Sequence, residues 1–482
     1  MKNCKIIAVL FFCFLASGLQ AADSRPNIVF IIADDIGWDD LGCYGHPLVA
    51  SPNIDRMAQE GIKFENFYLT TSSCSPSRTS IISGRYPHNT GAAELHTPLP
   101  MGIVSFPKLL KDAGYFTAQA GKWHMGDAPR SGFDVIHDSG ASMGDGGEGM
   151  WVPTLKERPR DKPFFMWFAA LDAHRPWGPN DFSGTHDPIL VEPPVYLAES
   201  LPTKRDLAQY YDEITRFDFF IGEVERELER QGVLDKTVII IMSDNGRPFP
   251  RSKTRMYDSG IKSPLIVLLP KGVNNNSLSV SKSLISSIDI APTILDLAGI
   301  EVGPSFQGRS FKGVLSNPEM DFRNFVFAEH NWHDHEAYER MVRTKDYLYV
   351  LNLRPNLSLN GPADSNKSDS YADLKRLRDL GKLSPAQSDI FIVPRPFEEL
   401  FFVAADYDQL INIGSVPMHN EKLEEMRNVL DQWRKETLDT EPDNLTGDWY
   451  DKETGDRLDK EQTRGTTPGG QEALNTIQKG PF

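Results

Sequence analysis

In Asn27-Ile28-Val29-Phe30-Ile31-Ile32-Ala33-Asp34-Asp35, six consecutive apolar residues are followed by two aspartates. A continuous apolar run of this length, rather than an alternating one, is typical of a strand buried on both faces of a sheet. Residues 162–171, 238–243 and 265–269 contain runs of the same character. We therefore predict four buried strands, the first of which ends at a pair of carboxylates.

Helical segments separate these strands. Residues 53–61, 106–114 and 205–232 carry apolar side chains at helical spacing, and each segment ends at a glycine. Strands that alternate with helices form a largely parallel sheet with helices on both faces. We assign this α/β domain to residues 23–318.

The pattern changes after residue 318. Short, closely spaced strand-like segments follow at residues 325–328, 341–343, 347–351 and 398–402. Residues 421–437 have the apolar spacing of an amphipathic helix. We predict a small antiparallel sheet with one packed helix over residues 319–440.

Two later segments are polar. Residues 358–370 are expected to form a loop. Residues 441–482, which are polar and rich in glycine, are expected to be a loosely held tail.

Polar side chains follow three of the predicted strands, in Asp34-Asp35, Asp172-Ala173-His174 and Asp244-Asn245. In open α/β sheets the ligand site lies at the carboxyl ends of the strands. Two adjacent carboxylates repel each other unless a cation lies between them. The side chains of the first and last clusters offer only oxygen ligands, which suit Ca²⁺ or Mg²⁺ rather than Zn²⁺. The alternative for each cluster alone is a set of turn and helix-cap residues.

The motif Cys74-Ser75-Pro76-Ser77-Arg78 precedes an apolar helical stretch that ends at Gly84. Pro76 suits the first turn of a helix, so Cys74 is expected at the helix N-terminus, where backbone N–H groups and the helix dipole favour anions. Arg78 returns to the same face one turn later. The alternative is a small buried residue before a helix, with Arg78 as a surface charge.

This motif, followed by Gly84-Arg85, resembles the formylglycine signature of the type I sulfatases. Further stretches resemble other elements of that family in the same order: residues 27–35, Gly121-Lys122-Trp123-His124, Ser243-Asp244-Asn245-Gly246 and residues 399–412. The resemblance covers nearly the whole chain after its first segment.

Within that family the chain looks most similar to the heparan N-sulfatases, or sulfamidases. The features that carry this resemblance are residues 72–78, Leu95-His96 and above all Pro248-Phe249-Pro250 directly after the strand-end cluster. Lys253 departs from the sulfamidase pattern, which has Arg at this place. Lys is common there in sulfatases generally.

The resemblance implies an alkaline-phosphatase-like sandwich, with a large mostly parallel central sheet and a small C-terminal antiparallel sheet. It implies one Ca²⁺ per chain, held by Asp34, Asp35, Cys74, Asp244 and Asn245. It implies the catalytic residues Cys74, Arg78, Lys122, His124, His174 and Lys253, with His96 and His330 as candidate sugar contacts. A formylglycine-generating or anaerobic sulfatase-maturating enzyme would convert Cys74 to 3-oxoalanine, which is formylglycine.

In the implied reaction, a hydroxyl of hydrated formylglycine, activated by Ca²⁺, attacks the sulfur in line. Cationic side chains neutralise the oxygens of the transferring group. His174, with Lys253, protonates the departing atom. His124 then removes the proton whose loss expels sulfate.

Residues 1–22 read as a signal peptide. Lys2 and Lys5 precede an apolar run over residues 6–15, and small residues follow. The run is too short to span a bilayer, and no later segment is long and apolar enough to do so. We therefore expect a secreted or periplasmic protein without a membrane span. After cleavage Cys43 and Cys74 remain, too few for a disulfide scaffold.

The formal net charge of −16 argues against a diffuse surface for polyanions such as nucleic acids. An anionic substrate would need a local basic pocket. The substrate is expected to be a sulfated mono- or oligosaccharide, with N-sulfoglucosamine favoured and an O-sulfated algal polysaccharide such as ulvan as the alternative. A phosphonate or phosphodiester hydrolase is a second enzyme class. A non-catalytic relative would be expected to have lost a metal carboxylate or the cysteine.

Overall fold

A computed structural model describes residues 25–271, 280–359, 361–458 and 464–482. The expected signal peptide, residues 1–22, lies outside the described residues. Among the described helices, none combines the length and apolar character that crossing a membrane requires.

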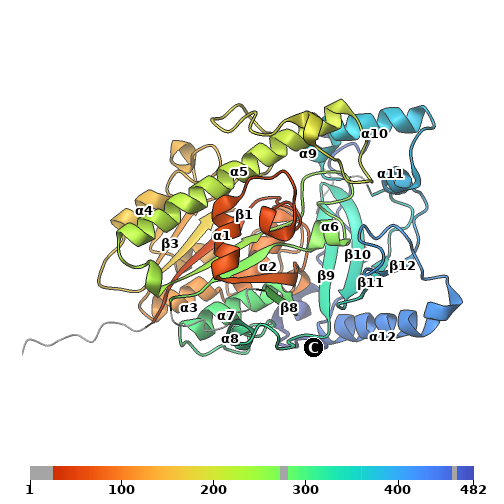
Figure 1. Ribbon diagram of the computed structural model, residues 1–482. Coiled ribbons are helices and arrows are strands. Elements are labelled where there is room, and N and C mark those ends of the chain that lie inside the picture. The colour runs from red at the N-terminus through yellow and green to blue at the C-terminus, as the bar shows by residue number, and fades with distance from the viewer. Residues whose placement is uncertain (1–24, 272–279, 360, 459–463) are drawn as a thin grey trace, which may run out of the picture.

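An eight-stranded sheet forms the centre of the molecule (Figure 1), in the order β4-β3-β5-β1-β6-β7-β2-β8. Its strands are β1 (Asn27–Ala33), β2 (Ile62–Tyr68), β3 (Phe116–Gly121), β4 (Val135–His137), β5 (Phe164–Ala169), β6 (Thr237–Ser243), β7 (Leu265–Leu268) and β8 (Val280–Ser286). Every neighbouring pair is parallel except the two pairs that β7 makes with β6 and β2. The predicted mostly parallel sheet is confirmed.

Strand β1 is central and buried on both faces. Val29 and Ile31 point into one hydrophobic core, whereas Ile28 and Phe30 point into the other. The first core packs under α1 (Pro52–Glu60), α4 (Trp151–Glu157), α5 (Leu201–Arg230) and α10 (Asp369–Asp379). The second packs under α2 (Cys74–Ser83), α3 (Phe106–Asp112), α7 (Ile290–Leu297) and α8 (Lys312–Ser316). The continuous apolar run of β1 thus reflects a three-layer sandwich.

A second, four-stranded antiparallel sheet lies beside the first (Figure 1), in the order β12-β11-β10-β9. Its strands are β9 (Val326–His333), β10 (His335–Arg343), β11 (Tyr347–Asn352) and β12 (Glu398–Phe402). Helix α12 (Asn420–Glu436) packs on it, with the Trp433 ring stacked on Phe327 at a centroid distance of 5.1 Å. The predicted small sheet with one helix is confirmed. The remaining helices are short: α6 (Asp258–Ile261), α9 (Ala363–Asn366), α11 (Pro385–Ser388) and α13 (Gly470–Asn475).

The prediction of a loop over residues 358–370 is wrong in part. Helix α9 lies within it, and α10 starts at Asp369. The Ser368 side chain caps α10 by accepting from the Tyr371 N–H, and the Ser370 hydroxyl donates to Asp206 Oδ2 at 2.6 Å. The side chains of Ser368 and Ser370 therefore bond within the protein rather than to water.

The prediction of a loosely held tail is also wrong for the described part of residues 441–482. Arg85 donates to the backbone carbonyl oxygens of Leu474 and Thr476 at 3.0 and 2.9 Å. Thr446 donates to the buried carboxylate of Glu94. The tail is fixed by partners on the α/β domain, which its own polar sequence does not reveal.

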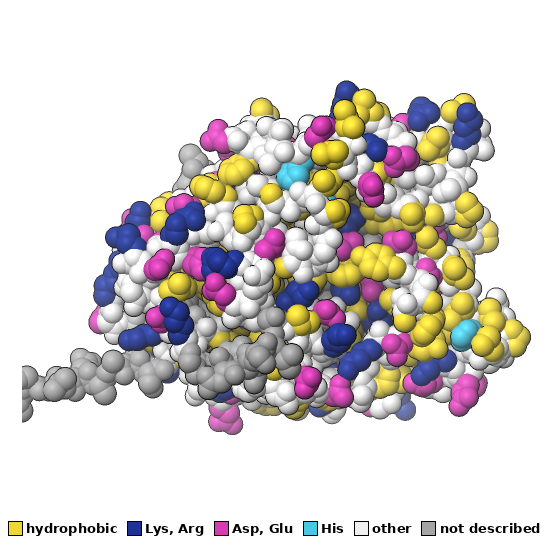
Figure 2. All heavy atoms as spheres, in the orientation of Figure 1, with side chains coloured by type: hydrophobic (Ala, Val, Ile, Leu, Met, Phe, Trp, Pro, Cys, Tyr) yellow, Lys and Arg dark blue, Asp and Glu magenta, His cyan; other side chains and the backbone are white. Residues whose placement is uncertain are grey.

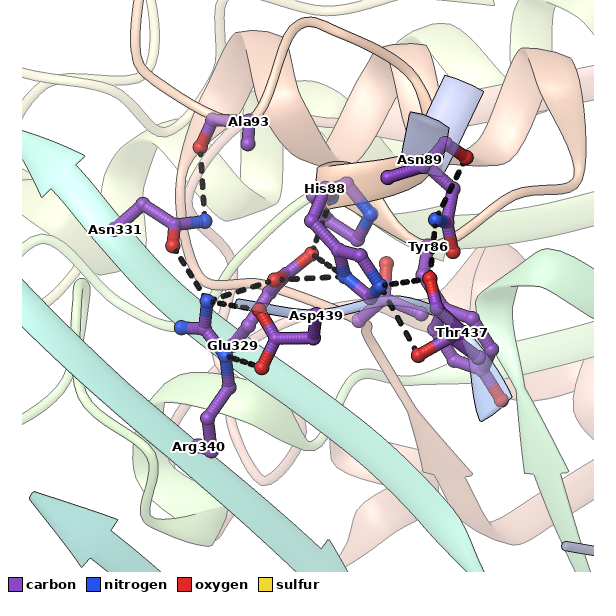
Figure 3. A network of polar contacts seen from close by, with 12 residues as sticks. Tyr86, His88, Asn89, Ala93, Glu329, Asn331, Arg340, Thr437 and Asp439 are labelled. Carbon is purple, nitrogen blue, oxygen red and sulfur yellow. Dashed lines mark hydrogen bonds and ion pairs between the residues drawn. The ribbon is translucent and has the colours of Figure 1, made fainter. Parts of the chain in front are cut away.

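A buried polar network ties the segment that follows α2 to the small sheet (Figure 3). His88, just after α2, contacts Glu329 on β9 through Nδ1 at 3.0 Å and Thr437 Oγ1 through Nε2 at 3.1 Å. Arg340 on β10 donates from Nε to Asp439 Oδ2 at 2.8 Å. Burial alone would raise the pKa of Asp439, but the Arg340 guanidinium holds it well below its usual range. The helix that begins at Cys74 is thereby locked to the small sheet.

Candidate functional site

The strand-end cluster assembles because β1 and β6 are parallel and in register. Ala33 lies opposite Ser243, so the residues that follow both strands leave the sheet side by side. The side chains of Asp34, Asp35, Asp244 and Asn245 are all fully buried. The Asp35 N–H donates to Asp244 Oδ1 at 3.2 Å, and Asn245 Nδ2 donates to the same oxygen at 2.8 Å. Asn245 Nδ2 also contacts the Asp35 carboxylate.

Cys74 is the first residue of α2, as predicted. Its Sγ lies 3.7 Å from Asp34 Oδ1 and 3.7 Å from Asn245 Nδ2. Burial raises the pKa of its thiol to about 12, although Lys122 and Lys253 oppose the shift. The unmodified side chain is therefore a neutral thiol at physiological pH and a poor nucleophile.

Each of the three carboxylates has a cationic partner. Arg78 Nε donates to Asp244 Oδ2 at 2.7 Å, and Lys253 Nζ donates to Asp35 Oδ2 at 2.7 Å. Lys122 contacts Asp34. Arg78 is fully buried, so the alternative of a surface charge is wrong. The charges of the three carboxylates and the three cations balance.

Burial and mutual repulsion nevertheless disfavour the charged forms of two of these carboxylates. Burial raises the pKa of Asp35 to about 7; Lys253 opposes the shift and Asp34 adds to it. Burial likewise raises the pKa of Asp244 to about 7, against the effect of Arg78. Desolvation also acts on Asp34, but Lys122 and its other cationic neighbours hold that pKa well below its usual range.

The donor set fits a hard divalent cation. Asp34, Asp35 and Cys74 offer ligand atoms that lie within 4.8 Å of one another. The side-chain oxygen of Asn245 is buried and has no hydrogen-bond partner, although the Nδ2 of the same amide is fully used. A buried amide oxygen without a partner, on a side chain that contacts two buried carboxylates, is a ligand that Ca²⁺ or Mg²⁺ could use.

Three histidines, His96, His124 and His174, lie beside this cluster. His124 Nε2 lies 2.6 Å from His96 Nδ1, and burial together with the nearby Lys122 lowers the pKa of His124 to about 2. The Nδ1 of His174 contacts the backbone oxygen of Arg175. Its Nε2 lies 3.6 Å from Asp364 and 4.0 Å from Asp35. Burial lowers the pKa of His174, and Lys253 adds to this effect.

Three residues of the site have left-handed backbone conformations that non-glycine residues rarely adopt. The φ angles of Asp35, His96 and His124 are 66°, 64° and 58°. Such conformations cost about 1–3 kcal/mol each and persist only where the surroundings enforce them.

Two adjoining cavities open above the cluster, with volumes of about 360 and 610 Å³. They share the side chains of His96, Lys122, His124 and His174. Cys74 and Lys253 line the smaller cavity, and Asp34 lines the larger one. Apart from His330, all eleven residues that the sequence predicts as catalytic, metal-binding or sugar-contacting therefore lie in this pocket or directly beneath it. They are Asp34, Asp35, Cys74, Arg78, His96, Lys122, His124, His174, Asp244, Asn245 and Lys253.

His330 is not brought into this pocket. Strand β9 continues to His333, beyond the segment that the sequence predicts, and His330 is buried within it. Its Nδ1 lies 3.4 Å from Glu339 Oε2 on β10. His333, three residues further on, does line the smaller cavity.

Sequence reasoning missed several lining residues. Asp334, Asp364, Lys367 and Tyr450 all line the cavity that contains Cys74. The last three come from the segments expected to be a loop and a loose tail. Their sequences carry no signal that distinguishes a pocket wall from a solvated surface.

Comparison with known proteins agrees with this geometry. The profile of the family described as Sulfatase matches residues 26–145 and 150–300. The chain belongs to the sulfatase family. A second profile, described as N-sulphoglucosamine sulphohydrolase, C-terminal, matches residues 251–353. The sulfatase thus carries its strand-end cluster and Cys74 within the matched region.

Characterised relatives are similar along most of their length. An ulvan-active sulfatase of Formosa agariphila is 29% identical over 85% of this chain and 74% of its own. The human N-sulphoglucosamine sulphohydrolase is 28% identical over 89% of this chain and 93% of its own. The protein is a sulfatase enzyme.

Solved structures share the fold. One of them, a complex with its substrate D-glucosamine-2-N,6-O-disulfate, superposes with a TM-score of 0.67 at 24% identity and covers 85% of this chain and 98% of its own. The predicted alkaline-phosphatase-like sandwich is confirmed.

Replacing Arg78 with Met should lower the free energy of unfolding by about 3–5 kcal/mol in a buffer with a chelator, because the carboxylates of Asp34 and Asp244 would lose a fully buried partner. Urea titration measures the loss. Arg226→Met removes an ion pair on α5 whose partners are 52% and 41% exposed, and should change stability by no more than about 0.5 kcal/mol. Equal effects of the two substitutions would contradict the balance of charges described above.

Proposed function

We propose that this sulfatase hydrolyses sulfate from a sulfated saccharide, with N-sulfoglucosamine as the preferred unit, through Cys74 converted to formylglycine and one bound Ca²⁺. The observation that carries the proposal is the charge-balanced cluster of three carboxylates and three cations around Cys74 at the floor of the pocket. Because the three carboxylates and three cations cancel, a bound divalent cation would give the site a net positive charge. A net positive charge would attract an anionic substrate.

The names of two relatives support a sulfated saccharide as the substrate. Both the ulvan-active sulfatase and the human N-sulphoglucosamine sulphohydrolase are named for sulfated sugars. The match of residues 251–353 to the C-terminal profile of the latter favours N-sulfoglucosamine. Cavities of about 360 and 610 Å³ are within the range that encloses a small ligand.

The distribution of surface charge favours recognition of an anionic substrate inside the pocket rather than on an extended basic surface. Lys and Arg side chains are interspersed with Asp and Glu over the face shown in Figure 2, rather than gathered into a basic patch. The cations that could meet a sulfate group are instead Arg78, Lys122 and Lys253, all buried or nearly so.

The oxygens of Asp34, Asp35, Asp244 and Asn245 would hold the ion. When bound, Ca²⁺ supplies Lewis-acid polarisation of the oxygens around the reacting sulfur. With the carboxylates engaged, Arg78, Lys122 and Lys253 balance the charge of the sulfuryl group, as cationic side chains do in phosphoryl transfer.

The histidines divide the proton transfers. His124 is neutral at physiological pH, because burial and Lys122 lower its pKa, so it can accept a proton near Cys74. In His174, Nδ1 is occupied by the Arg175 carbonyl, which leaves Nε2 to face the pocket. A proton on Nε2 is readily given up, because burial and Lys253 disfavour the charged ring. We assign to His174 the protonation of the departing oxygen or nitrogen.

The cellular setting of the proposal follows from the sequence. The signal peptide that the sequence predicts over residues 1–22 would direct the chain out of the cytoplasm. A formylglycine-generating or anaerobic sulfatase-maturating enzyme would be its partner in maturation, because a buried thiol with a raised pKa does not supply the nucleophile.

Two other activities compete with this proposal. The Formosa agariphila relative favours O-desulfation of an algal polysaccharide such as ulvan. A phosphonate or phosphodiester hydrolase would use the same cations and metal ligands.

The deciding experiment is a desulfation screen at fixed enzyme concentration. N-Sulfoglucosamine, its 6-O-sulfated counterpart, ulvan oligosaccharides and a phosphodiester are compared by kcat/KM, with release of sulfate or phosphate as the readout. We expect the highest value for the N-sulfated sugar. A higher value for ulvan fragments would transfer the proposal to O-desulfation, and a higher value for the phosphodiester would overturn the proposal that a sulfated saccharide is the preferred substrate.

Cys74→Ala should abolish turnover, and so should Cys74→Ser in a host that does not modify Ser, because neither side chain supplies the aldehyde. The mass spectrum of the peptide that contains Cys74, from enzyme expressed with a maturase, should show the aldehyde in place of the thiol. Turnover by both variants, or a plain thiol in fully active enzyme, would overturn the role of formylglycine.

Calcium should raise the free energy of unfolding of the mature protein, by about 4 kcal/mol at a thousandfold excess over the dissociation constant, and a chelator should reverse the gain. Asp35→Asn removes a carboxylate from the cluster and should greatly reduce the gain. The control Asp112→Asn changes an exposed carboxylate on α3 and should keep it. A calcium effect of the same size in all three proteins would place the ion elsewhere.

A further inference from the structure

The turn that carries His96 into the pocket has an unusual set of supports. His96 lines both cavities and has a φ of 64°. Its backbone N–H donates to Ser75 Oγ in the first turn of α2 at 2.8 Å. Since a left-handed conformation at a histidine is strained, the neighbouring contacts must hold the turn in place.

Strand β9 supports the turn from one side. The Leu95 N–H donates to the Trp332 carbonyl oxygen at 3.1 Å. Asn331 Nδ2 donates to the Ala93 carbonyl oxygen at 3.4 Å, at the edge of the buried network in Figure 3. These contacts fix the entry of the turn but leave the Leu95 carbonyl and the Glu94 carboxylate to other partners.

The C-terminal tail supplies those partners. Arg464 donates from one terminal nitrogen to the Leu95 carbonyl oxygen at 2.7 Å, and from the other to Glu94 Oε2 at 3.1 Å. Thr446 Oγ1 donates to the same carboxylate at 2.8 and 2.9 Å and accepts from the Gly465 N–H. Glu94 is 3% exposed, so its carboxylate depends on these donors.

Aromatic rings hold the guanidinium of Arg464 in position. It lies 5.0 Å from the ring centroid of Trp332 and 4.9 Å from that of Trp449. The two indole rings meet edge to face at 4.8 Å. Trp332 and Trp449 also pack against Cys74 and Leu95. Planar stacking and forked hydrogen bonding are properties of Arg that Lys reproduces only in part.

We propose that Arg464 is a positioning residue of the substrate pocket: by bridging Glu94 and Leu95 it fixes His96 against the bound saccharide. The proposal rests on the proposed function, in which His96 contacts the sugar. It gives the tail a role in recognition, since Tyr450 of the same tail lines the cavity beside His96. Arg464 itself touches neither Cys74 nor the cluster of carboxylates and cations in any contact described for it.

The test is a double-mutant cycle between Arg464→Met and His96→Ala, read as KM for the best substrate of the desulfation screen. Met keeps an apolar stem against the indole rings and removes the hydrogen bonds. Each single variant should raise KM about tenfold, the loss expected for one hydrogen bond, with a smaller change in kcat. The double variant should be no worse than His96→Ala, because Arg464 acts through His96. Arg464→Lys should recover part of the loss.

Amide hydrogen exchange gives a readout that needs no substrate. Exchange at residues 94–97 should be faster in Arg464→Met than in the unaltered protein. The matched control is Arg378→Met, which breaks an exposed ion pair between α10 and Glu453 of the tail, and should change neither exchange at residues 94–97 nor KM. If Arg464→Met does not fold, Thr446→Val tests the same carboxylate with a side chain of similar shape.

Additive effects in the cycle, or unchanged exchange at residues 94–97, would overturn the role of Arg464. Lack of turnover of every sulfated saccharide by the unaltered enzyme would instead reject the proposed function. In that event faster exchange at residues 94–97 would still support the positioning of the turn, and unchanged exchange would reject both.

Discussion

The buried ion cluster beneath Cys74 is the constraint on which the rest of the site depends. Taking a charge out of water costs several kcal/mol, and the cost is offset only when each charge meets a partner in good geometry. Here Asp34, Asp35 and Asp244 meet Lys122, Lys253 and Arg78. The cations come from helix α2 and from the chain after β3 and β6, so the cluster can form only when these segments converge at the ends of the strands.

This cluster is better explained by function than by stability. An apolar core of the same volume would be at least as stable as a set of buried ion pairs. Burial raises the pKa of Asp35 and of Asp244 to about 7, so holding both carboxylates in their charged form is costly even beside Lys253 and Arg78. Strained backbone at Asp35, His96 and His124 adds to the cost. A protein that only had to fold would gain nothing from this arrangement, whereas binding a cation and an anionic group uses all of it.

The sequence predicts the part of the molecule whose signals are local. The apolar run before Asp34 indicates a doubly buried strand, and Pro76 places Cys74 at a helix N-terminus; both are confirmed. Strands β2, β3, β4 and β8 were not predicted, because their apolar runs are shorter or interrupted by polar residues. The sequence predicts His330 as a sugar contact beyond the strand at residues 325–328, because the polar side chains that follow hide the continuation of β9; its burial depends on pairing with β10.

The pocket wall could not be predicted, because its determinants are not local. The tail is held largely through its backbone carbonyl groups, to which Arg85 donates, and such contacts leave no pattern in the tail's own side chains. Asp364 lies in a polar segment that reads as solvated, yet it stands 3.6 Å from His174. A polar residue looks the same in a sequence whether its partner is water or a distant side chain.

The residues around Cys74 are specified by local sequence signals, whereas the residues of the pocket wall depend on long-range contacts. The cluster around Cys74 is specified by charge balance among strand ends and α2, and on the proposed function it would serve any sulfate group. The wall formed by α9 and the tail is specified by long-range contacts and surrounds whatever the sulfate is attached to. Relatives named for ulvan and for N-sulfoglucosamine are 29% and 28% identical to this chain, so identity alone does not choose between the two substrates. On the proposed function, the part of the pocket wall that would discriminate between them includes the late segments, from which Asp364, Lys367 and Tyr450 line the cavity beside Cys74.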